Sequence, residues 1–211
     1  MENDSIIFDI DGTLWNACPV SALGWNNGLK KLGIDRKVSA KDIEGVAGHP
    51  YDECIEILFP GLARQYPELN GVLEQNETEA IQRLGGVFYD GVLENVPKLS
   101  ESYRIFIVSN CQEWYLDILL DRAGFGNFIE GYDCNGMSGL PKGRMLARLK
   151  EKYSLKTPVY VGDTASDQLA TDIAGMEFVY AAYGFGTPAK PARTFASFSA
   201  FAGYFLDASA N

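Results

Sequence analysis

Histidine, clustered cysteine and long apolar runs are scarce in this 211-residue sequence. His49 is the only histidine, and the four cysteines stand far apart with no C-x-x-C pair. A zinc site is therefore not expected, and reduced thiols in the cytoplasm are the simplest account. No stretch reaches the roughly 18 apolar residues that cross a bilayer, and the acidic N-terminus lacks a signal-peptide pattern. We expect a cytoplasmic protein with no membrane partner.

Basic side chains are also in the minority, because 18 lysines and arginines face 28 aspartates and glutamates, for a net charge of −10. A surface with this charge repels the phosphate backbone of nucleic acid, so nucleic acid is not an expected partner. The chain length and the 46% share of apolar residues suit one large domain or a domain with an insert. The sequence leaves monomer and homodimer open.

Short continuous apolar runs predict strands that are covered on both faces, as in a parallel sheet. The runs fall at residues 6–10, 104–109, 158–162 and 177–182, with a weaker one at 128–132. Amphipathic segments between them predict helices at residues 113–123, 142–153 and 167–174. This alternation of strand and helix predicts an α/β core.

Residues 16–87 carry helical patterns only, at 20–32, 40–46, 51–59 and 69–84. Glycine and proline separate these segments, and no strong strand interrupts them. We therefore expect a helical domain of residues 16–87 inserted into a core of residues 1–15 and 88–211. Near the C-terminus, four phenylalanines at three- and four-residue spacing predict the buried face of a final helix: Phe195, Phe198, Phe201 and Phe205.

Polar side chains follow the predicted strands, at the edge of a parallel sheet where function gathers. These strand-end residues, with one lysine at a helix start, are Asp9, Asp11, Ser109, Asn110, Asp163, Asp167 and Lys142. Acids beside a serine and a lysine suit Mg²⁺ and a phosphate group, because Mg²⁺ takes few oxygen ligands and accepts phosphate oxygens as well. An ionised Asp9 would attack phosphorus without a base, and Asp11 would serve as general acid and base.

Each of these residues also has an ordinary interpretation. Paired acids at a strand end suit a solvated turn, and acids before a helix suit an N-terminal cap. Lys142 alone would be a surface lysine, and Ser109 alone a helix cap. Asn110 suits a phosphate contact and a turn equally well. A lone histidine such as His49 is more often structural than substrate-facing.

Four segments in order resemble the motifs of the haloacid dehalogenase superfamily: Asp9-x-Asp11-Gly12-Thr13-Leu14, Ser109-Asn110, Lys142-Gly143 and Gly162-Asp163-Thr164-x-x-Asp167. The resemblance implies a Rossmann-like parallel sheet with a helical cap of the C1 type. It implies that Asp9 is the nucleophile and a Mg²⁺ ligand, and that Asp11 is the general acid and base with its carbonyl on the metal.

The same resemblance implies roles for the other motif residues. Asp163 would be a direct metal ligand, and Asp167 an outer carboxylate that orients Lys142 or metal-bound water. Ser109 and Lys142 would bind the phosphoryl group. The further candidates for substrate binding are Thr13, Asn110 and His49.

Three other segments resemble phosphoglycolate phosphatase-like members: Gly48-His49-Pro50-x-x-x-x-Ile55, Ala174-Gly175-Met176 and Tyr183-Gly184-Phe185-Gly186. Asn16 departs from that subgroup, which commonly has an acid there. The resemblance predicts Mg²⁺-dependent hydrolysis of a small phosphorylated metabolite through an aspartyl-phosphate. A phosphomutase, a phosphonate hydrolase and a non-catalytic binding protein on this scaffold are the alternatives. Spacing singles out no cap lysine or arginine for a substrate carboxylate, and Lys41 and Arg64 are two candidates.

Overall fold

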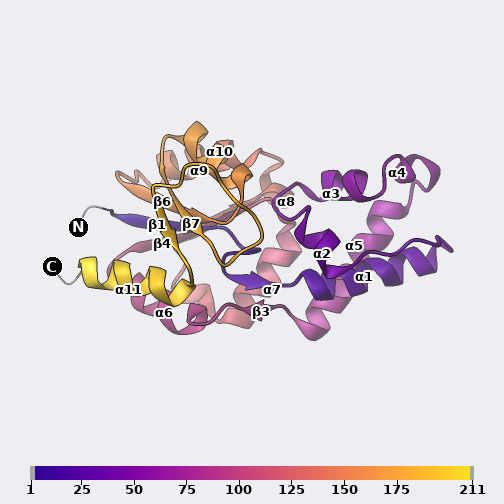
Figure 1. The fold of residues 1–211 in the computed structure, drawn as a ribbon, viewed down its shortest axis with the longest axis horizontal. Helices are drawn as coiled ribbons and strands as arrows, with labels where there is room; N and C mark the ends of the chain where they lie inside the picture. Colours follow the sequence, from indigo (N-terminus) through magenta and orange to yellow (C-terminus); the bar gives the residue numbers. More distant parts are fainter. Residues whose placement is uncertain (1–2, 210–211) are drawn as a thin grey trace.

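A computed structural model describes residues 3–209, which form a core sheet flanked by helices and a helical insert (Figure 1). Within these residues, six parallel strands form the core sheet in the order β5-β4-β1-β6-β7-β8. Their bounds are Ser5–Phe8 (β1), Arg104–Ser109 (β4), Gly131–Cys134 (β5), Pro158–Gly162 (β6), Glu177–Ala181 (β7) and Arg193–Phe195 (β8). The predicted Rossmann-like α/β fold is confirmed.

The first strand lies at the centre of the sheet, between β4 and β6. Phe8 is in register with Ile107 of β4 and with Val161 of β6. Because the three strands run in parallel, the residues that follow them emerge at one edge of the sheet. This register brings the ends of three sequence motifs together.

Helices cover both faces of the sheet. The helices α6 (Val92–Ser100), α7 (Glu113–Ala123) and α11 (Phe198–Ser209) share one hydrophobic cluster with Ile6 and Phe8. The helices α9 (Lys142–Lys152) and α10 (Ala165–Ala174) share another with Ile7. Successive side chains of β1 thus bury on opposite faces, which explains its continuous apolar run. Two short elements complete the core, η1 (Phe125–Asn127) and α8 (Asn135–Ser138).

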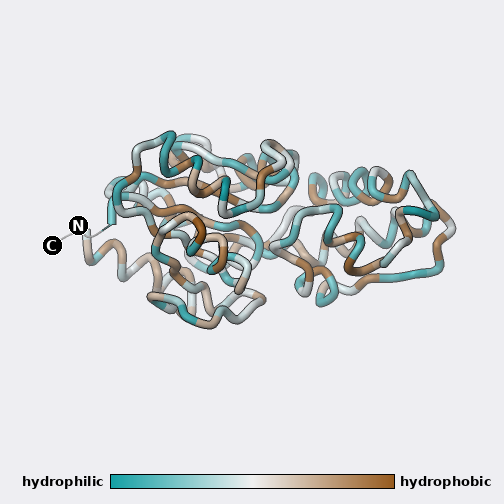
Figure 2. The backbone as a smooth tube through the Cα atoms, turned by 90° about the horizontal axis from the view of Figure 1, so that it is seen from above, coloured by the Kyte–Doolittle hydropathy of each residue, from teal (hydrophilic) through white to brown (hydrophobic). Residues whose placement is uncertain are grey.

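Five helices between β2 and β3 form the insert, with bounds Cys18–Lys31 (α1), Ala40–Glu44 (α2), Tyr51–Leu58 (α3), Leu62–Gln65 (α4) and Leu69–Leu84 (α5). They bury a hydrophobic cluster of their own around Trp25, Leu29 and Leu73. Figure 2 shows the insert as a second lobe joined to the core by a narrow neck. The assignment of residues 16–87 as a separate domain stays a prediction.

The neck is a two-stranded antiparallel ribbon of β2 (Trp15–Asn16) and β3 (Val87–Phe88). The expected domain boundaries fall inside this ribbon. Asn16 Oδ1 accepts a hydrogen bond of 2.9 Å from the Cys18 backbone N–H, so Asn16 satisfies a donor at the start of α1. Across the gap, Trp114 Nε1 of α7 donates to Glu74 Oε1 of α5 at 2.9 Å.

Two predictions at the edges of the sheet need correction. The strand expected at 128–132 is β5 at Gly131–Cys134, because Phe128 closes the turn of η1 instead. Phe195 does not belong to the final helix but to β8, where its ring still contacts Phe201 with centroids 5.6 Å apart. Within residues 3–209, none of the helices combines the length and apolar character needed to span a bilayer.

Candidate active site

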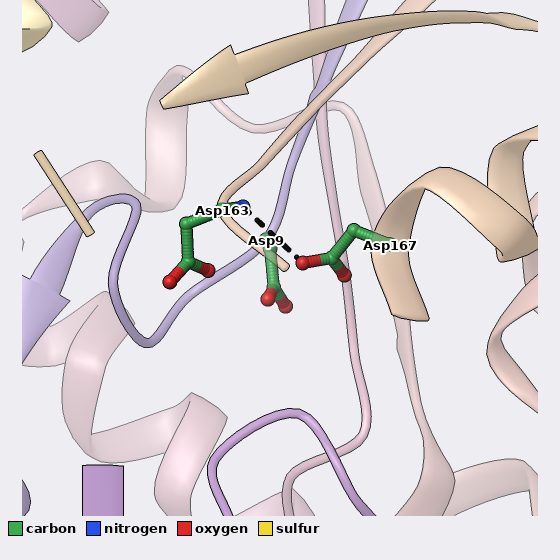
Figure 3. Close-up of side chains that lie close together, drawn as sticks. All are labelled: Asp9, Asp163 and Asp167. Atoms are coloured by element: carbon green, nitrogen blue, oxygen red, sulfur yellow. Dashed lines mark hydrogen bonds between the residues drawn. The ribbon is translucent and has the colours of Figure 1, made fainter. Parts of the chain in front are cut away.

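Three carboxylates meet at the edge where β1 and β6 end. Asp9 follows β1, Asp163 follows β6, and Asp167 lies in the first turn of α10 (Figure 3). Oxygen atoms of the three groups lie within 4.8 Å of one another. Asp9 is 2% exposed and the other two are fully buried, so their negative charges are poorly hydrated and need a cation.

Lys142 supplies one positive charge to this group from the start of α9. Its Nζ donates to Asp167 Oδ1 at 2.6 Å and lies 3.1 Å from Asp9 Oδ1, a longer and less aligned contact. Burial alone would lower the pKa of Lys142, but the charges of Asp167 and Asp9 together raise it above its usual value. Lys142 is therefore a charged donor fixed beside Asp9.

Asp167 has no free capacity for a metal ion. Its Oδ1 accepts from Lys142, and its Oδ2 accepts from the Thr164 hydroxyl at 2.6 Å and the Thr164 backbone N–H at 2.9 Å. Although burial opposes ionisation, Lys142 and these hydrogen bonds lower the pKa of Asp167. Its carboxylate holds Lys142 and closes the capping box of α10.

Asp9 and Asp163 do have free capacity. The Oδ1 atoms of both are buried and have no hydrogen-bond partner among the described residues. Burial raises the pKa of Asp9 to about 6, against the opposing charge of Lys142. Burial, with the charges of Asp167 and Asp9, raises the pKa of Asp163 to about 8. Within residues 3–209, Asp163 Oδ1 has no partner and Asp9 Oδ1 has only the longer ionic contact with Lys142, so at this charge density the two carboxylates fit a divalent cation that prefers oxygen ligands.

The second oxygen of Asp163 is fixed from the C-terminal part of the core. The Phe185 backbone N–H donates to Asp163 Oδ2 at 2.7 Å. Gly12 lies against the same carboxylate with a φ of +75°, and a Cβ on it would collide with Asp163. The Asp-Gly step of the first motif thus leaves room for the acid of the last motif.

Asp11 points away from the three carboxylates toward α7. The Tyr115 hydroxyl donates to Asp11 Oδ1 at 2.5 Å. Burial raises the pKa of Asp11 to about 7, and the bond from Tyr115 limits that rise. A carboxyl with this pKa exchanges its proton readily near neutral pH, which suits a general acid and base.

A cavity of about 80 Å³ lies between the strand ends and the insert. Four predicted site residues from the core line the cavity: Asp9, Asp11, Ser109 and Asn110. From the insert, the predicted residue His49 lines it as well. Asn110 Nδ2 donates to the Gly48 carbonyl at 2.7 Å, which links β4 to the insert. Lys142, Asp163, Asp167 and Thr13 are buried and do not line the cavity.

The sequence did not indicate several side chains at this site. Tyr115 holds Asp11, and the insert contributes Trp25, Tyr51 and Glu77 to the cavity. The one signal for Glu77 in the sequence was its place midway between Leu73 and Ile81, on the apolar face of the helix predicted at 69–84. The Tyr183-Gly184-Phe185-Gly186 segment resembled relatives, but that resemblance could not show that a backbone N–H at Phe185 would bind Asp163.

The haloacid dehalogenase-like hydrolase family matches residues 6–181 of this sequence, most of its length. The chain belongs to this family. The family inferred from the four motifs is thereby confirmed. This hydrolase carries all four motifs on one edge of one sheet, around the three carboxylates and Lys142.

Relatives of this hydrolase cover nearly its whole length. A phosphoglycolate phosphatase of Colwellia psychrerythraea is 25% identical over 196 residues, 87% of this chain and 86% of that protein. Another of Photobacterium profundum is 27% identical over 194 residues, 85% of this chain and 83% of that protein. The crystal structure of a predicted phosphoglycolate phosphatase from Haemophilus somnus has a TM-score of 0.83 at 22% identity and covers 97% of this chain and 98% of that one.

Proposed function

We propose that this hydrolase cleaves a small phosphate monoester in a Mg²⁺-dependent reaction with Asp9 as the nucleophile. One observation carries the proposal: the buried Asp9 carboxylate lines the cavity and lies 3.1 Å from the charged Lys142. An oxyanion beside a fixed cation, at the floor of a cavity, is the arrangement that in-line attack on phosphorus requires.

The first step forms a bond between Asp9 and phosphorus and breaks the ester P–O bond. The leaving alkoxide takes a proton from Asp11, so an alcohol departs and an aspartyl-phosphate remains. In the second step water attacks phosphorus and gives its proton to Asp11, which releases phosphate and regenerates Asp9. Lys142 stays charged and, with Ser109, holds the equatorial phosphoryl oxygens.

Asp9 and Asp163 would hold the Mg²⁺, together with the carbonyl of Asp11. Bound there, Mg²⁺ supplies Lewis-acid stabilisation of the negative charge on the phosphoryl group. The free Oδ1 of Asp163, and the Oδ1 of Asp9 that has only the ionic contact with Lys142, support this assignment. Asp167 would orient Lys142.

The insert would act as a cap over the cavity, excluding bulk water and selecting the leaving group. The Asn110–Gly48 and Trp114–Glu74 hydrogen bonds across the gap support this role. The names of the two relatives make phosphoglycolate a candidate substrate. Sugar phosphates and nucleoside monophosphates are equally open on the core residues alone. A cytoplasmic location stays a prediction.

Hydrolysis of p-nitrophenyl phosphate with Mg²⁺ and with excess chelator tests the proposal. We expect turnover with Mg²⁺, at least a hundredfold loss on chelation, as a rough figure, and recovery when Mg²⁺ returns. Borohydride treatment of acid-quenched enzyme should convert an acyl-phosphate at position 9 to homoserine, detected by mass spectrometry. Turnover that is indifferent to chelator would contradict the metal role. Transfer of phosphate to a second hydroxyl of the substrate would favour a mutase. If no ester releases phosphate, a non-catalytic binding protein is favoured instead.

Replacing Asp163 by asparagine should mainly weaken metal binding. The amide keeps an acceptor for the Phe185 N–H but loses the charge that would face the ion. We expect the Mg²⁺ concentration for half-maximal activity to rise by about tenfold or more, with activity partly restored at high Mg²⁺. Titration of activity against Mg²⁺ checks this, and an unchanged half-maximal concentration would remove Asp163 from the metal site.

Replacing Tyr115 by phenylalanine should move the alkaline limb of the pH profile upward. The Tyr115 hydroxyl stabilises the ionised form of Asp11, so its loss raises the pKa of Asp11 above about 7. Protonated Asp11 then persists to higher pH, by about one unit at most. The profile of kcat/KM should be measured with glycerol phosphate, whose alkoxide needs a proton to leave.

p-Nitrophenyl phosphate provides the substrate control for this shift, because its phenolate leaves without a proton and its alkaline limb should stay in place. Tyr132→Phe is the matched variant, since Tyr132 is 43% exposed on β5 and does not line the cavity. A downward shift with glycerol phosphate would refute the acid role of Asp11.

A further inference from the structure

The cavity is poor in positive charge. Among the described residues that line it, none is lysine or arginine, and three are acids: Asp9, Asp11 and Glu77. Lys142 does not line the cavity and lies 3.1 Å from Asp9, where the phosphoryl group would meet it. His49 is the one basic group in the lining, and its half-exposed ring lies 3.4 Å from Glu53. Beyond Asp9 and Asp11 the described lining therefore contains one acid, Glu77, and no lysine or arginine.

A carboxylate on the leaving group would find no cation there. Lys41 and Arg64 are exposed and do not line the cavity. The N-terminus of α3 lies beside the Gly48–Tyr51 lining, but its first turn already carries Asp52 and Glu53. These acids compensate the partial positive charge of the helix terminus. The surroundings therefore repel a second anionic group.

Glu77 is the insert acid that faces this space, and it is 6% exposed. Trp25 Nε1 donates to its Oε2 at 2.6 Å. The contact depends on Gly24, because a Cβ there would lie 2.5 Å from the Glu77 Cα, so α1 and α5 touch directly at this level. Burial raises the pKa of Glu77, and the hydroxyls of Ser21 and Tyr51 oppose the rise. Because burial makes the charged form of this carboxyl costly, a positively charged ligand in the cavity would compensate it.

Aromatic rings surround the same space. Trp25 and Tyr51 meet edge to face with centroids 5.7 Å apart, and Trp114 and Tyr115 meet in the same way at 5.6 Å. All four residues line the cavity. The faces of such rings attract a cation, most strongly where water is excluded. Apart from Asp9 and Asp11, the lining thus combines one carboxyl, that of Glu77, with several π systems.

Asn110 adds an acceptor that lacks a donor. Its Nδ2 donates to the Gly48 carbonyl, so the amide orientation is fixed and Oδ1 faces the other way. Asn110 is 7% exposed and lines the cavity, and its Oδ1 is buried without a hydrogen-bond partner among the described residues. A buried acceptor of this kind calls for a donor on the ligand.

We propose, building on the phosphatase activity above, that the substrate is the phosphate monoester of a small amino alcohol. Its ammonium group would pair with Glu77 among the aromatic rings and donate to Asn110 Oδ1 while the phosphoryl group lies at Asp9. The reaction consumes water and releases phosphate and the free amino alcohol. The cavity of about 80 Å³ has room for the few heavy atoms of such a leaving group.

Three esters of nearly equal size test the proposal: 2-aminoethyl phosphate, 2-hydroxyethyl phosphate and phosphoglycolate. They place an ammonium, a hydroxyl or a carboxylate at the same distance from phosphorus. We expect kcat/KM to be highest for the amine and lowest for the carboxylate, with about tenfold or more between neighbours. Preference for phosphoglycolate would overturn the proposal, and so would preference for the neutral ester.

Glu77→Gln tests the role of the charge, because the amide keeps an acceptor for Trp25. The ratio of kcat/KM for the amine ester to that for the neutral ester should fall by about tenfold or more. A uniform loss on all three esters, with the ratio unchanged, would assign Glu77 a structural role and contradict the proposal. Glu79→Gln, exposed on the same helix, is the matched control and should leave the ratio unchanged.

Binding to the Asp9→Asn protein separates this inference from the proposed function. In calorimetric titrations with Mg²⁺ present, the amine ester should have the lowest Kd of the three esters, whatever the catalytic rate. If acetyl phosphate, an activated substrate without a donor, is not hydrolysed by the wild type, the phosphatase function fails. If it is hydrolysed but phosphoglycolate binds more tightly than the amine ester, only the leaving-group inference fails.

Discussion

Asp9→Asn is expected to lower turnover by roughly four orders of magnitude or more while leaving the protein folded. The amide has nearly the same shape but is no nucleophile, so no acyl-phosphate forms at position 9. Lys142 keeps its 2.6 Å hydrogen bond to Asp167 in the variant. Initial rates with p-nitrophenyl phosphate, and mass spectrometry of quenched enzyme, measure the effect.

Stability should not fall with this substitution. Burial raises the pKa of Asp9 to about 6, above its usual value, so its ionisation is less favourable in the folded protein than in the unfolded chain. The penalty is present above the folded pKa, and a neutral amide avoids it at pH 7. The melting temperature should therefore be equal or higher. Asp117→Asn on the exposed side of α7 is the matched control, and a fully active Asp9→Asn protein would refute the mechanism.

Lys142→Met is expected to damage both activity and folding. Lys142 is 3% exposed, and its loss leaves two buried carboxylates, Asp9 and Asp167, without their cation. Breaking such a buried pair lowers the free energy of unfolding by about 3–5 kcal/mol. Loss of a phosphoryl-binding donor should lower kcat by about a hundredfold or more. Denaturant titration in metal-free buffer and steady-state kinetics measure the two effects.

The instability should depend on pH in a defined direction. Lys142 lowers the pKa of both neighbouring carboxyls, so its removal raises them. Protonation then relieves the repulsion, and the loss of stability should be smaller at pH 5 than at pH 8. Lys142→Arg keeps the charge and should recover most of the stability but not the rate. Lys152→Met, exposed at the end of the same helix, should change neither.

Elements buried on both faces were predictable from sequence, and those at edges were not. The runs at 104–109 and 158–162 coincide with β4 and β6, because central parallel strands are apolar throughout. The strand β8 is three residues of mixed polarity at the sheet edge and carries no such signal. The helix α6 contains Pro97, a residue that normally indicates the end of a helix.

The candidate site divides in the same way. The acids at strand ends could be predicted to meet, since parallel register fixes where Asp9 and Asp163 emerge. The contact between Trp25 and Glu77 spans 52 residues and depends on how α1 packs on α5. No local pattern encodes that crossing. The sequence therefore predicted the residues that the strand ends bring to the cavity but, apart from His49, not those on its insert side.

All three tryptophans of the chain lie at the junction of the two lobes. Trp15 is buried in the ribbon, Trp25 holds Glu77, and Trp114 bridges from α7 to α5. Tryptophan emission, excited at wavelengths where the 11 tyrosines absorb little, therefore arises from the region where the lobes meet and a ligand would enter. The enzyme carries its own optical reporter of that junction, without any attached dye.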